Sequence, residues 1–434
     1  MSGSVRDGVS THHTRVESGD AAAAKIVEAV RQIVESPPDL PALQRLHDLL
    51  ADIDALPVAD PLGTLLAGAS RARVREVGRW LAEHGTRRNA VAAGLVLIGL
   101  TGDERDRELL LLLGSIEDLT LYAVVALERT QSDRDMAVFE MARRVRAWGR
   151  IHSVERLEGT TDPEIKAWLL REGFRNGVMD EYLAYIAATT GGLADALTAA
   201  VVDDELLDGA GGILAALSDT DGPVEDITDY RDGPVAIDRY LALVRDRPTL
   251  GRAVAVLSLG DKGRDVATGL AWIEVVRRAL DAPDLDTFMD ALWPAQQLGL
   301  KLRDRVGGWL RSHPFEQHLW FYADVEDLAE LAEQLLPLPD LATGPQAELG
   351  IGPGFEADHA LDVVMSREGG QTWPLVRTAL ANRLTRNRYN ALKALRAWPR
   401  DSLPADAVAA VRAAAAAEPD DKLRVELEEL LRIE

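Results

Sequence analysis

Residues 146–159, RAWGRIHSVERLEG, place Trp148, Arg150, His152 and Glu155 within two turns of a predicted helix. If this stretch forms a pocket, Trp148 supplies a flat wall, Arg150 binds an anion, and His152 with Glu155 forms an acid–base pair. This stretch is therefore the strongest candidate ligand site, and no residue in it is assigned a catalytic role. The segment that follows adds further candidate ligand-binding residues, which are Trp168, Arg171, Arg175, Asn176 and Tyr182.

The same stretch also has a structural interpretation. Ile151, Val154 and Leu157 fill one arc of a helical wheel drawn at about 100° per residue, and Arg150 lies inside that arc. An arginine in this position can lay its aliphatic stem on the apolar residues and send its guanidinium to a loop carbonyl. His152 then becomes a hydrogen-bonded interior histidine. We favour this packing interpretation and keep the pocket as the alternative.

Helices must position these side chains. Hydrophobic residues make up 47% of the chain and aromatic residues only 5%. Apolar residues recur at spacings of three and four over residues 21–35, 40–56, 71–84 and 87–100, and no stretch alternates with period two. The sequence therefore predicts an all-α fold.

A repeat follows from the breaks between the predicted helices. Short polar breaks end at Asp103, Asp133, Asp162, Gly192 and Asp221, at intervals of 29 or 30 residues. We expect the aspartates to be N-caps, whose carboxylates accept the first free amides of the next helix. Each interval accommodates two helices of about ten to twelve residues and two turns. The pattern predicts an α-solenoid of stacked HEAT-like helix pairs, with a right-handed superhelix expected and its clearest repeats over residues 87–221.

Four regions are predicted along the chain. Residues 1–20 are polar and rich in glycine and serine, so we expect a disordered segment, and His12 and His13 within it are assigned no role. Residues 21–336 form the helical-repeat array. Residues 337–357 read as a Gly/Pro-rich loop, and residues 358–434 as further helical repeats that continue the same solenoid.

The C-terminal region contains a stretch that is similar in pattern to residues 146–159. NRYNALKAL, residues 387–395, can be laid over GRIHSVERL, residues 149–157, so that Arg388 takes the place of Arg150 and Asn390 that of His152. Arg388 therefore joins the candidate ligand-binding residues. Two longer passages, WGRIHSVERLEGTTDPEIKAWLLREGFRNGVMDEYLAY (148–185) and ALDVVMSREGG…LTRNRYNALKALRAWP (360–399), resemble uncharacterised bacterial HEAT-like helical-repeat proteins. The resemblance implies a helical-repeat fold.

Some proteins of that group carry the automatically assigned label limonene hydroxylase, which implies a redox cofactor that handles oxygen. The chain has no cysteine for a haem thiolate, no Gly-rich dinucleotide loop and no histidine–carboxylate cluster for non-haem iron, so the label is unsupported. His313 and His318 lie five residues apart beside Glu316 and several aromatic residues, a pattern more typical of aromatic packing than of a metal site. We predict no cofactor and no metal.

The charge of the chain constrains its partners. A net charge of −23 makes general nucleic-acid binding unfavourable, because a broad acidic surface repels phosphate backbones. The longest apolar run, residues 90–100, is far shorter than the roughly 20 residues of a membrane span. We expect a cytoplasmic protein that does not bind membranes. A local basic cluster either binds an acidic protein segment or a phosphate, or it pairs with nearby glutamates; its members are Arg71, Arg73, Arg75, Arg79, Arg87 and Arg88.

These observations favour a non-catalytic helical-repeat scaffold that binds a protein partner on its concave face, in a regulatory or toxin-neutralising role. The partner and the oligomeric state are not assigned. The alternative is a small-molecule-binding protein or an enzyme with a pocket around Trp148, Arg150, His152 and Glu155.

Overall fold

A computed structural model describes residues 2–14, 18–36, 39–222, 224–346, 350, 352–399 and 403–432. These residues form helices and connecting turns without any β-strand, which confirms the predicted all-α class. Within the described part of the chain, each helix is too short or too polar to cross a membrane. The chain forms two compact units: residues 1–247 with 258–263, and residues 248–257 with 264–434.

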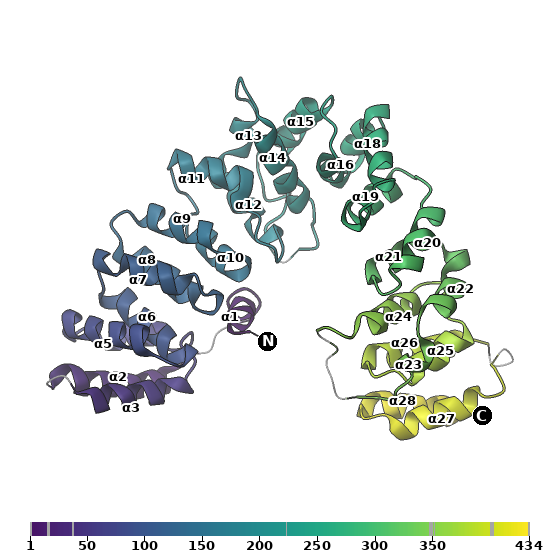
Figure 1. Cartoon of the computed structure of the whole chain (residues 1–434). Coiled ribbons are helices and arrows are strands. Elements are labelled where there is room, and N and C mark those ends of the chain that lie inside the picture. Colours follow the sequence, from purple (N-terminus) through teal and green to yellow (C-terminus); the bar gives the residue numbers. More distant parts are fainter. Residues whose placement is uncertain are drawn as a thin grey trace. The chain divides into compact units, whose positions relative to one another are not determined.

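The first unit is drawn from purple to teal in Figure 1. Its α-helices are α1 Gly3–His12, α2 Asp20–Glu35, α3 Leu40–Ala51, α4 Ala59–Leu65, α5 Arg71–His84, α6 Arg88–Thr101, α7 Arg107–Gly114, α8 Thr120–Thr130, α9 Arg134–Arg144, α10 Ala147–Glu155, α11 Pro163–Trp168, α12 Glu181–Gly191, α13 Leu193–Ala196, α14 Asp204–Leu217 and α15 Gly233–Val244. Two 3₁₀ turns, η1 Glu104–Asp106 and η2 Glu117–Leu119, and a π-helical turn, η3 Leu169–Gly173, complete it.

The second unit is drawn from green to yellow in Figure 1. Helix α16 Leu250–Ser258 and helix α17 Gly260–Ala267 lie at the boundary between the units. The remaining α-helices are α18 Leu270–Leu280, α19 Leu285–Gln297, α20 Arg303–Ser312, α21 Gln317–Tyr322, α22 Val325–Leu335, α23 Leu338–Leu341, α24 Glu356–Ser366, α25 Trp373–Leu380, α26 Thr385–Ala397, α27 Ala407–Ala417 and α28 Asp421–Arg432.

Alternate helices of the first unit stack into layers. Helices α6, α8, α10, α12 and α14 contact one another in sequence, and α7 and α9 contact each other and pack against this row. Helix α6 is buried from Ala90 to Gly99 because α3, α5 and α8 all pack around it. Helices α5 and α6 approach so closely that a Cβ on Gly94 would lie 2.8 Å from the carbonyl oxygen of Gly78.

The predicted N-cap aspartates are partly confirmed. Asp162 accepts the amides of Glu164 and Ile165 at 2.8 and 3.2 Å, and Asp103 accepts the amide of Arg105 at 3.0 Å. Two other predictions are wrong. Asp133 does occupy the N-cap position of α9, but the expected capping bond is absent, because its carboxylate pairs with Arg107 at 2.7 Å. Asp221 lies in a turn and begins no helix.

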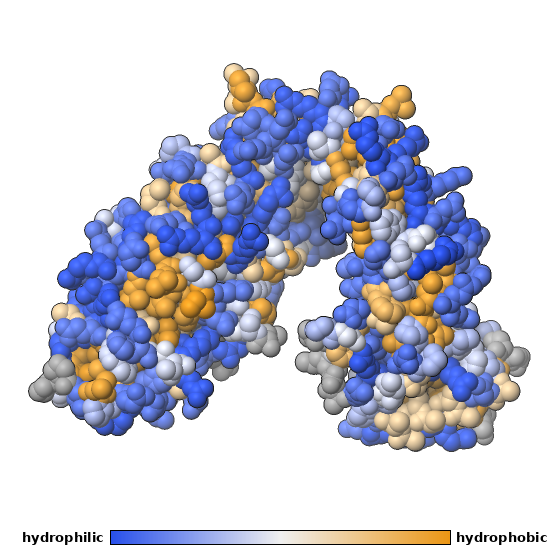
Figure 2. Space-filling view, viewed as in Figure 1, coloured by the Kyte–Doolittle hydropathy of each residue, from blue (hydrophilic) through white to orange (hydrophobic). Residues whose placement is uncertain are grey.

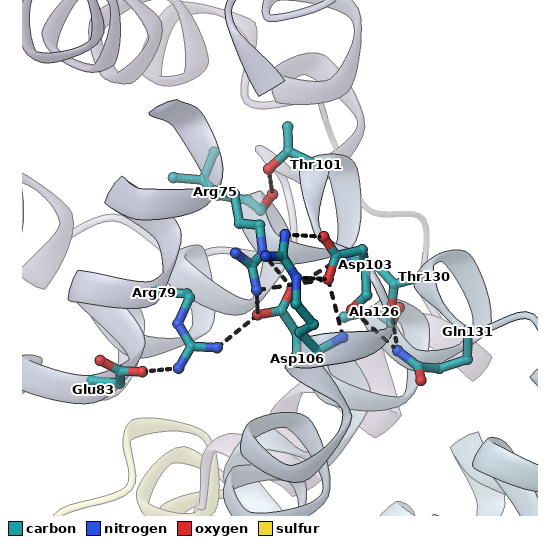
Figure 3. Close-up of polar contacts among 11 residues, drawn as sticks. Arg75, Arg79, Glu83, Thr101, Asp103, Asp106, Ala126, Thr130 and Gln131 are labelled. Atoms are coloured by element: carbon teal, nitrogen blue, oxygen red, sulfur yellow. Dashed lines mark hydrogen bonds and ion pairs between the residues drawn. The ribbon is translucent and has the colours of Figure 1, made fainter. Parts of the chain in front are cut away.

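A buried aspartate connects α5 to η1, as Figure 3 shows. Asp106 is fully buried and accepts hydrogen bonds from Arg75 Nε and Arg79 Nη1, both at 2.7 Å. It also accepts the amide of Asp103 at 3.1 Å. Burial alone raises the pKa of Asp106, but these donors and the arginine charges outweigh it and hold the pKa below its usual range. Two members of the predicted arginine cluster therefore serve the fold.

The second unit contains a buried ion pair. Arg388 of α26 donates to Glu418 from Nε at 2.7 Å and from Nη2 at 2.8 Å, with both side chains almost wholly buried. The Nη1 group of Arg388 also donates to the carbonyls of Asn382 and Arg383, at 2.9 and 2.8 Å. Asp358 of α24 accepts a hydrogen bond from Asn382 at 2.8 Å, which ties α24 to the same network.

Two predicted boundaries differ from the structure. The disorder predicted for residues 1–20 is wrong for Gly3–His12, which form α1, and for Asp20, which begins α2; residues 1 and 15–17 lie outside the described part. The predicted loop of residues 337–357 contains the short helix α23 and the start of α24, with residues 347–349 and 351 outside the description. It does not divide the chain, because Gly344 donates to the carbonyl of Ala381 at 2.7 Å and α23 contacts α25.

The side of the molecule drawn in Figure 2 is mostly hydrophilic, as the charged composition leads one to expect. Hydrophobic areas interrupt it, and one of them lies over the helices α6 to α8 of the first unit. Of these helices, α6 and α8 belong to the row, and α1 contacts them through Arg88 and Tyr122.

Candidate functional site

The N-terminal helix α1 meets the candidate stretch of α10. The imidazole of His12 lies 5.3 Å from the ring centroid of Trp148 and 5.7 Å from that of His152. Its Nε2 atom is 2.6 Å from Glu155 Oε1. Tyr182 of α12 stands edge-on to the same imidazole at 5.3 Å. Trp148, His152, Glu155 and Tyr182 are thus brought together, and the residue that joins them is His12.

The environment of His12 favours its protonated form. Its Nδ1 lies 3.0 Å from the carbonyl of Gly8 and 2.9 Å from the hydroxyl of Thr11, so both ring nitrogens face acceptors. The hydrogen bond to Glu155 raises the pKa of His12. Burial opposes the ionisation of Glu155, but the hydrogen bonds and charges of His12 and His152 prevail and lower its pKa to about 2.

Aspartate 7 forms the second polar contact of α1. It is buried, and it accepts hydrogen bonds from Arg88 Nη2 of α6 and from the hydroxyl of Tyr122 of α8, the latter at 3.0 Å. His13, just beyond the helix, lies 2.6 Å from the Tyr182 hydroxyl. Arg88 belongs to the predicted basic cluster, and its partner here is the single carboxylate of Asp7 in the same chain.

Glycine 8 lies directly against the indole of Trp148. A Cβ built on Gly8 would meet Trp148 Cδ2 at 2.2 Å, closer than real Cβ atoms approach other atoms. Only a glycine at this position lets α1 come close enough for the contacts of Asp7 and His12 to form together.

The N-terminus of α1 meets a carboxylate. The amide of Ser4 donates to Asp118 Oδ1 of η2 at 2.7 Å, which places a negative charge at the positive end of the helix dipole. Ser4, Asp7, Gly8 and His12 thus all contact the same surface, at helical spacings of three and four. We call this surface the α1-binding face; it comprises Arg88, Asp118, Tyr122, Trp148, His152, Glu155 and Tyr182.

Arg150 lies away from the α1-binding face. Its Nε donates to the carbonyl of Val145 at 3.0 Å, and its Nη1 donates to the carbonyl of Arg175 at 3.4 Å. The guanidinium also stands 5.1 Å from the ring centroid of Trp168, and burial lowers its pKa. Arg388 bonds to the carbonyl five residues before it, Arg383, as Arg150 does to Val145. Both arginines therefore bind loop carbonyls, as the packing interpretation predicts.

The other candidate residues are dispersed. Arg171 pairs with Asp203 at 2.8 Å, and Arg175 lies over the ring of Phe174 at 4.8 Å. Asn176 is buried and closes its own loop, where its Oδ1 accepts the amides of Val178 and Met179. These side chains do not converge with His152 and Glu155 on one site.

His152 retains an unused polar atom. The side chain is 4% exposed, and its Nδ1 faces Glu155 at 3.7 Å. Its Nε2 has no hydrogen-bond partner among the described residues. A buried polar atom without a partner costs free energy, and none of the contacts that α1 makes satisfies this one.

A pocket of about 280 Å³ adjoins the end of α1. Thr11 contributes to its wall, and Glu128 and Arg156 supply polar groups. The Thr11 hydroxyl donates to the carbonyls of Asp7 and Gly8, both at 3.0 Å, and so bonds within its own helix. The apolar lining is formed by Leu56, Leu95, Val96, Leu121 and Val125.

The structure shows no cluster of three or more histidine, aspartate or glutamate side chains suited to a metal ion within the described residues. His318 pairs with Glu316 at 2.9 Å, and His313 lies 2.9 Å from the hydroxyl of Ser312. These two histidines thus bond to their neighbours along the chain. No protein-family model and no curated protein sequence matches the chain.

Proposed function

We propose that this chain is a HEAT-like helical-repeat protein that binds a helical segment of a protein partner on the α1-binding face. The single observation that carries the proposal is the position of α1, which lies across α6, η2, α8 and α10 as a bound helix does. Recognition of a helix by one of its faces, through residues spaced three and four apart, is a recurrent mode of protein binding.

The contacts of α1 are specific in geometry but provide little apolar burial. Its buried residues are Ser4, Asp7 and Gly8, without a single large apolar side chain among them. The pair of His12 with Glu155 is partly exposed, and such pairs contribute about 0–1 kcal/mol, whereas buried apolar side chains dominate the affinity of most interfaces. A partner helix that matches the polar contacts and adds apolar ones can therefore displace α1.

The unpartnered Nε2 of His152 supports the same conclusion. An occupant that offers a hydrogen-bonding group to this atom gains a hydrogen bond that α1 does not make. We infer that a helix that also satisfies this atom would fit the face better than α1 does, which favours the regulatory form of the proposal, with α1 as an internal competitor.

The small-molecule or enzyme alternative has less support. It requires Arg150, His152 and Glu155 to act on one ligand. Arg150 instead bonds to Val145 and Arg175, while His152 and Glu155 face α1.

Binding in trans tests the proposal. A full-length Gly8→Leu chain cannot seat its own α1 against Trp148, so a fluorescent peptide of residues 2–14 should bind this variant at least tenfold more tightly than the wild-type chain, since ten-fold corresponds to about 1.4 kcal/mol of competition. A full-length Ser10→Leu chain adds the same side chain at another position of α1 and serves as control. Equal peptide binding by the three chains, or no binding by any, contradicts the proposal.

A further inference from the structure

We propose that the pocket beside Thr11 is the anchor subsite of the α1-binding face and that it takes a large aliphatic side chain of the partner helix. The inference rests on the proposed function and specifies the partner. It predicts a helix with a carboxylate at the position of Asp7, glycine at that of Gly8, an aliphatic residue at that of Thr11 and a cation at that of His12.

The first step is the register of α1. The residues Ser4, Asp7 and Gly8 face the α1-binding face, and position 11 is the next in this series of three and four. Thr11 itself is exposed, and it lines the pocket from this position. We therefore expect a side chain that is longer than threonine to extend from position 11 toward the apolar wall formed by α6 and α8.

The second step is the chemistry of the pocket. Leu95 and Val96 of α6 and Leu121 and Val125 of α8 line it, and they form an apolar wall. The hydroxyl of Thr11 bonds to its own backbone and makes no hydrogen bond to these residues. Exchange of this threonine for leucine consequently buries apolar surface without loss of a polar contact to the pocket.

The third step is the polar edge. Arg156 Nε lies 3.3 Å from Glu128 Oε2, so these two of the charged residues that line the pocket are paired with each other. The Nη1 group of Arg156 also donates to the carbonyl of His152 at 2.5 Å. An aliphatic side chain suits such a site because it leaves the existing pair intact.

The fourth step is the charge pattern on either side of the anchor. Arg88 and Tyr122 bind the carboxylate of Asp7, and Glu155 binds the imidazole of His12. These groups select a partner with the same order of charges along its helix, and they reject one with the order reversed, because like charges would then face each other. Trp148 selects glycine between them.

A test within the chain itself uses Thr11→Leu in the full-length protein. Hydrogen exchange of the α1 amides should slow about tenfold, since burial of one leucine side chain stabilises docking by at least this factor. Ser10→Leu is the matched control, because it adds the same side chain outside the pocket lining. Exchange that is no slower in Thr11→Leu than in Ser10→Leu overturns the anchor subsite.

A test in trans separates this inference from the proposed function. Peptides of residues 2–14 carrying Thr11→Leu or Ser10→Leu are titrated onto the full-length Gly8→Leu chain. We expect the first to bind about tenfold more tightly than the second. This difference should vanish when Val125→Trp fills the pocket of the Gly8→Leu chain.

The two tests have distinguishable failures. If slowed exchange is found in the Thr11→Leu chain but no peptide binds in trans, the anchor subsite stands and the proposed function fails. If the wild-type peptide binds in trans but the leucine at position 11 brings no gain, the proposed function stands and the anchor subsite fails.

Discussion

Gly8 and Trp148 lie in direct contact, with the backbone of α1 against the indole of α10 and no room for a Cβ between them. The contact joins the beginning of the chain to a helix in the middle of the first unit. It also controls whether α1 can dock, because Asp7 and His12 reach their partners only when Gly8 sits against the ring.

Replacement of Gly8 by alanine should therefore release α1. Alanine favours the helix itself by about 1 kcal/mol over glycine, so any loss of docking comes from the clash with Trp148. Hydrogen exchange of the amides of residues 3–12 should approach that of an isolated peptide. Ser10→Ala, which adds helix propensity without a clash, should leave the exchange slow; rapid exchange in both variants would show that the contact is not decisive.

The docking of α1 should depend on pH through His12. Docking raises the pKa of His12, so this contribution is complete below the pKa of the free histidine and is lost as the pH rises through the docked value. Glu155, with a pKa of about 2, stays ionised over this range. Exchange of the α1 amides, corrected for its intrinsic pH dependence, should accelerate on the alkaline side.

His12→Gln is the control for this pH dependence. It should weaken docking at acidic pH and remove the alkaline loss. Other titratable groups also face the site, namely Asp7, His13, Tyr122, His152 and Tyr182. A pH profile unchanged by His12→Gln assigns the dependence to one of these groups instead.

Removal of one member of the buried pair of Arg388 and Glu418 should lower the free energy of unfolding more than replacement of both. Arg388→Ala leaves Glu418 buried without its charge partner, and we expect a loss of about 3–5 kcal/mol in the free energy of unfolding of the second unit. The double variant Arg388→Met with Glu418→Leu should lose clearly less, because no charge stays unpaired. Urea denaturation measures both. Equal losses in the single and double variants would mean that the side chains act through packing alone.

The buried carboxylate of Asp106 should make the first unit sensitive to acid. Its pKa is lowered in the folded protein, so the stabilisation is present above the pKa of the unfolded chain and is lost as the pH falls through the folded value. Asp106→Asn should reduce stability by about 2 kcal/mol at pH 7, through the lost charged hydrogen bonds to Arg75 and Arg79. Urea midpoints at neutral and acidic pH should then differ less in the variant than in the wild type.

A stabilising substitution is expected at Ala147. This residue begins α10 with a φ of 46°, in the left-handed region that costs a non-glycine residue roughly 1–2 kcal/mol. Its amide donates to the carbonyl of Asn176 at 2.8 Å, and glycine can keep that bond. Ala147→Gly should therefore raise the thermal midpoint of the first unit slightly. A lowered midpoint would show that the methyl group or chain entropy matters more than the strain.

The helices whose buried residues are apolar could be predicted closely. The spacing of apolar residues predicts a helix over residues 71–84, and α5 spans Arg71–His84. Arg150 could be assigned to packing because the apolar arc around it is visible in the sequence. Helix α1 could not be predicted in this way, because the residues that it buries are serine, aspartate and glycine. A search for periodic hydrophobic residues does not detect such a helix.

The site was only half predictable for a related reason. Trp148, His152 and Glu155 lie close together along one helix, so their spacing reveals them. His12 is 143 residues from Glu155, and local patterns contain no signal for that pairing. Ser4, Asp7, Gly8, Thr11 and His12 have the spacing of residues on one face of a helix. This periodicity of polar and small residues is the feature of the sequence that could have predicted α1.

The covalent attachment of α1 sets a threshold for any competing helix. Residues 13–19 join α1 to α2, and short tethers of this kind hold a ligand at an effective concentration on the order of millimolar. A partner in solution must therefore overcome a local concentration that neither dilution nor expression level changes. Its apparent affinity falls in proportion to the fraction of chains whose face is free. The strength with which α1 docks would then set the partner concentration at which the protein begins to bind its partner.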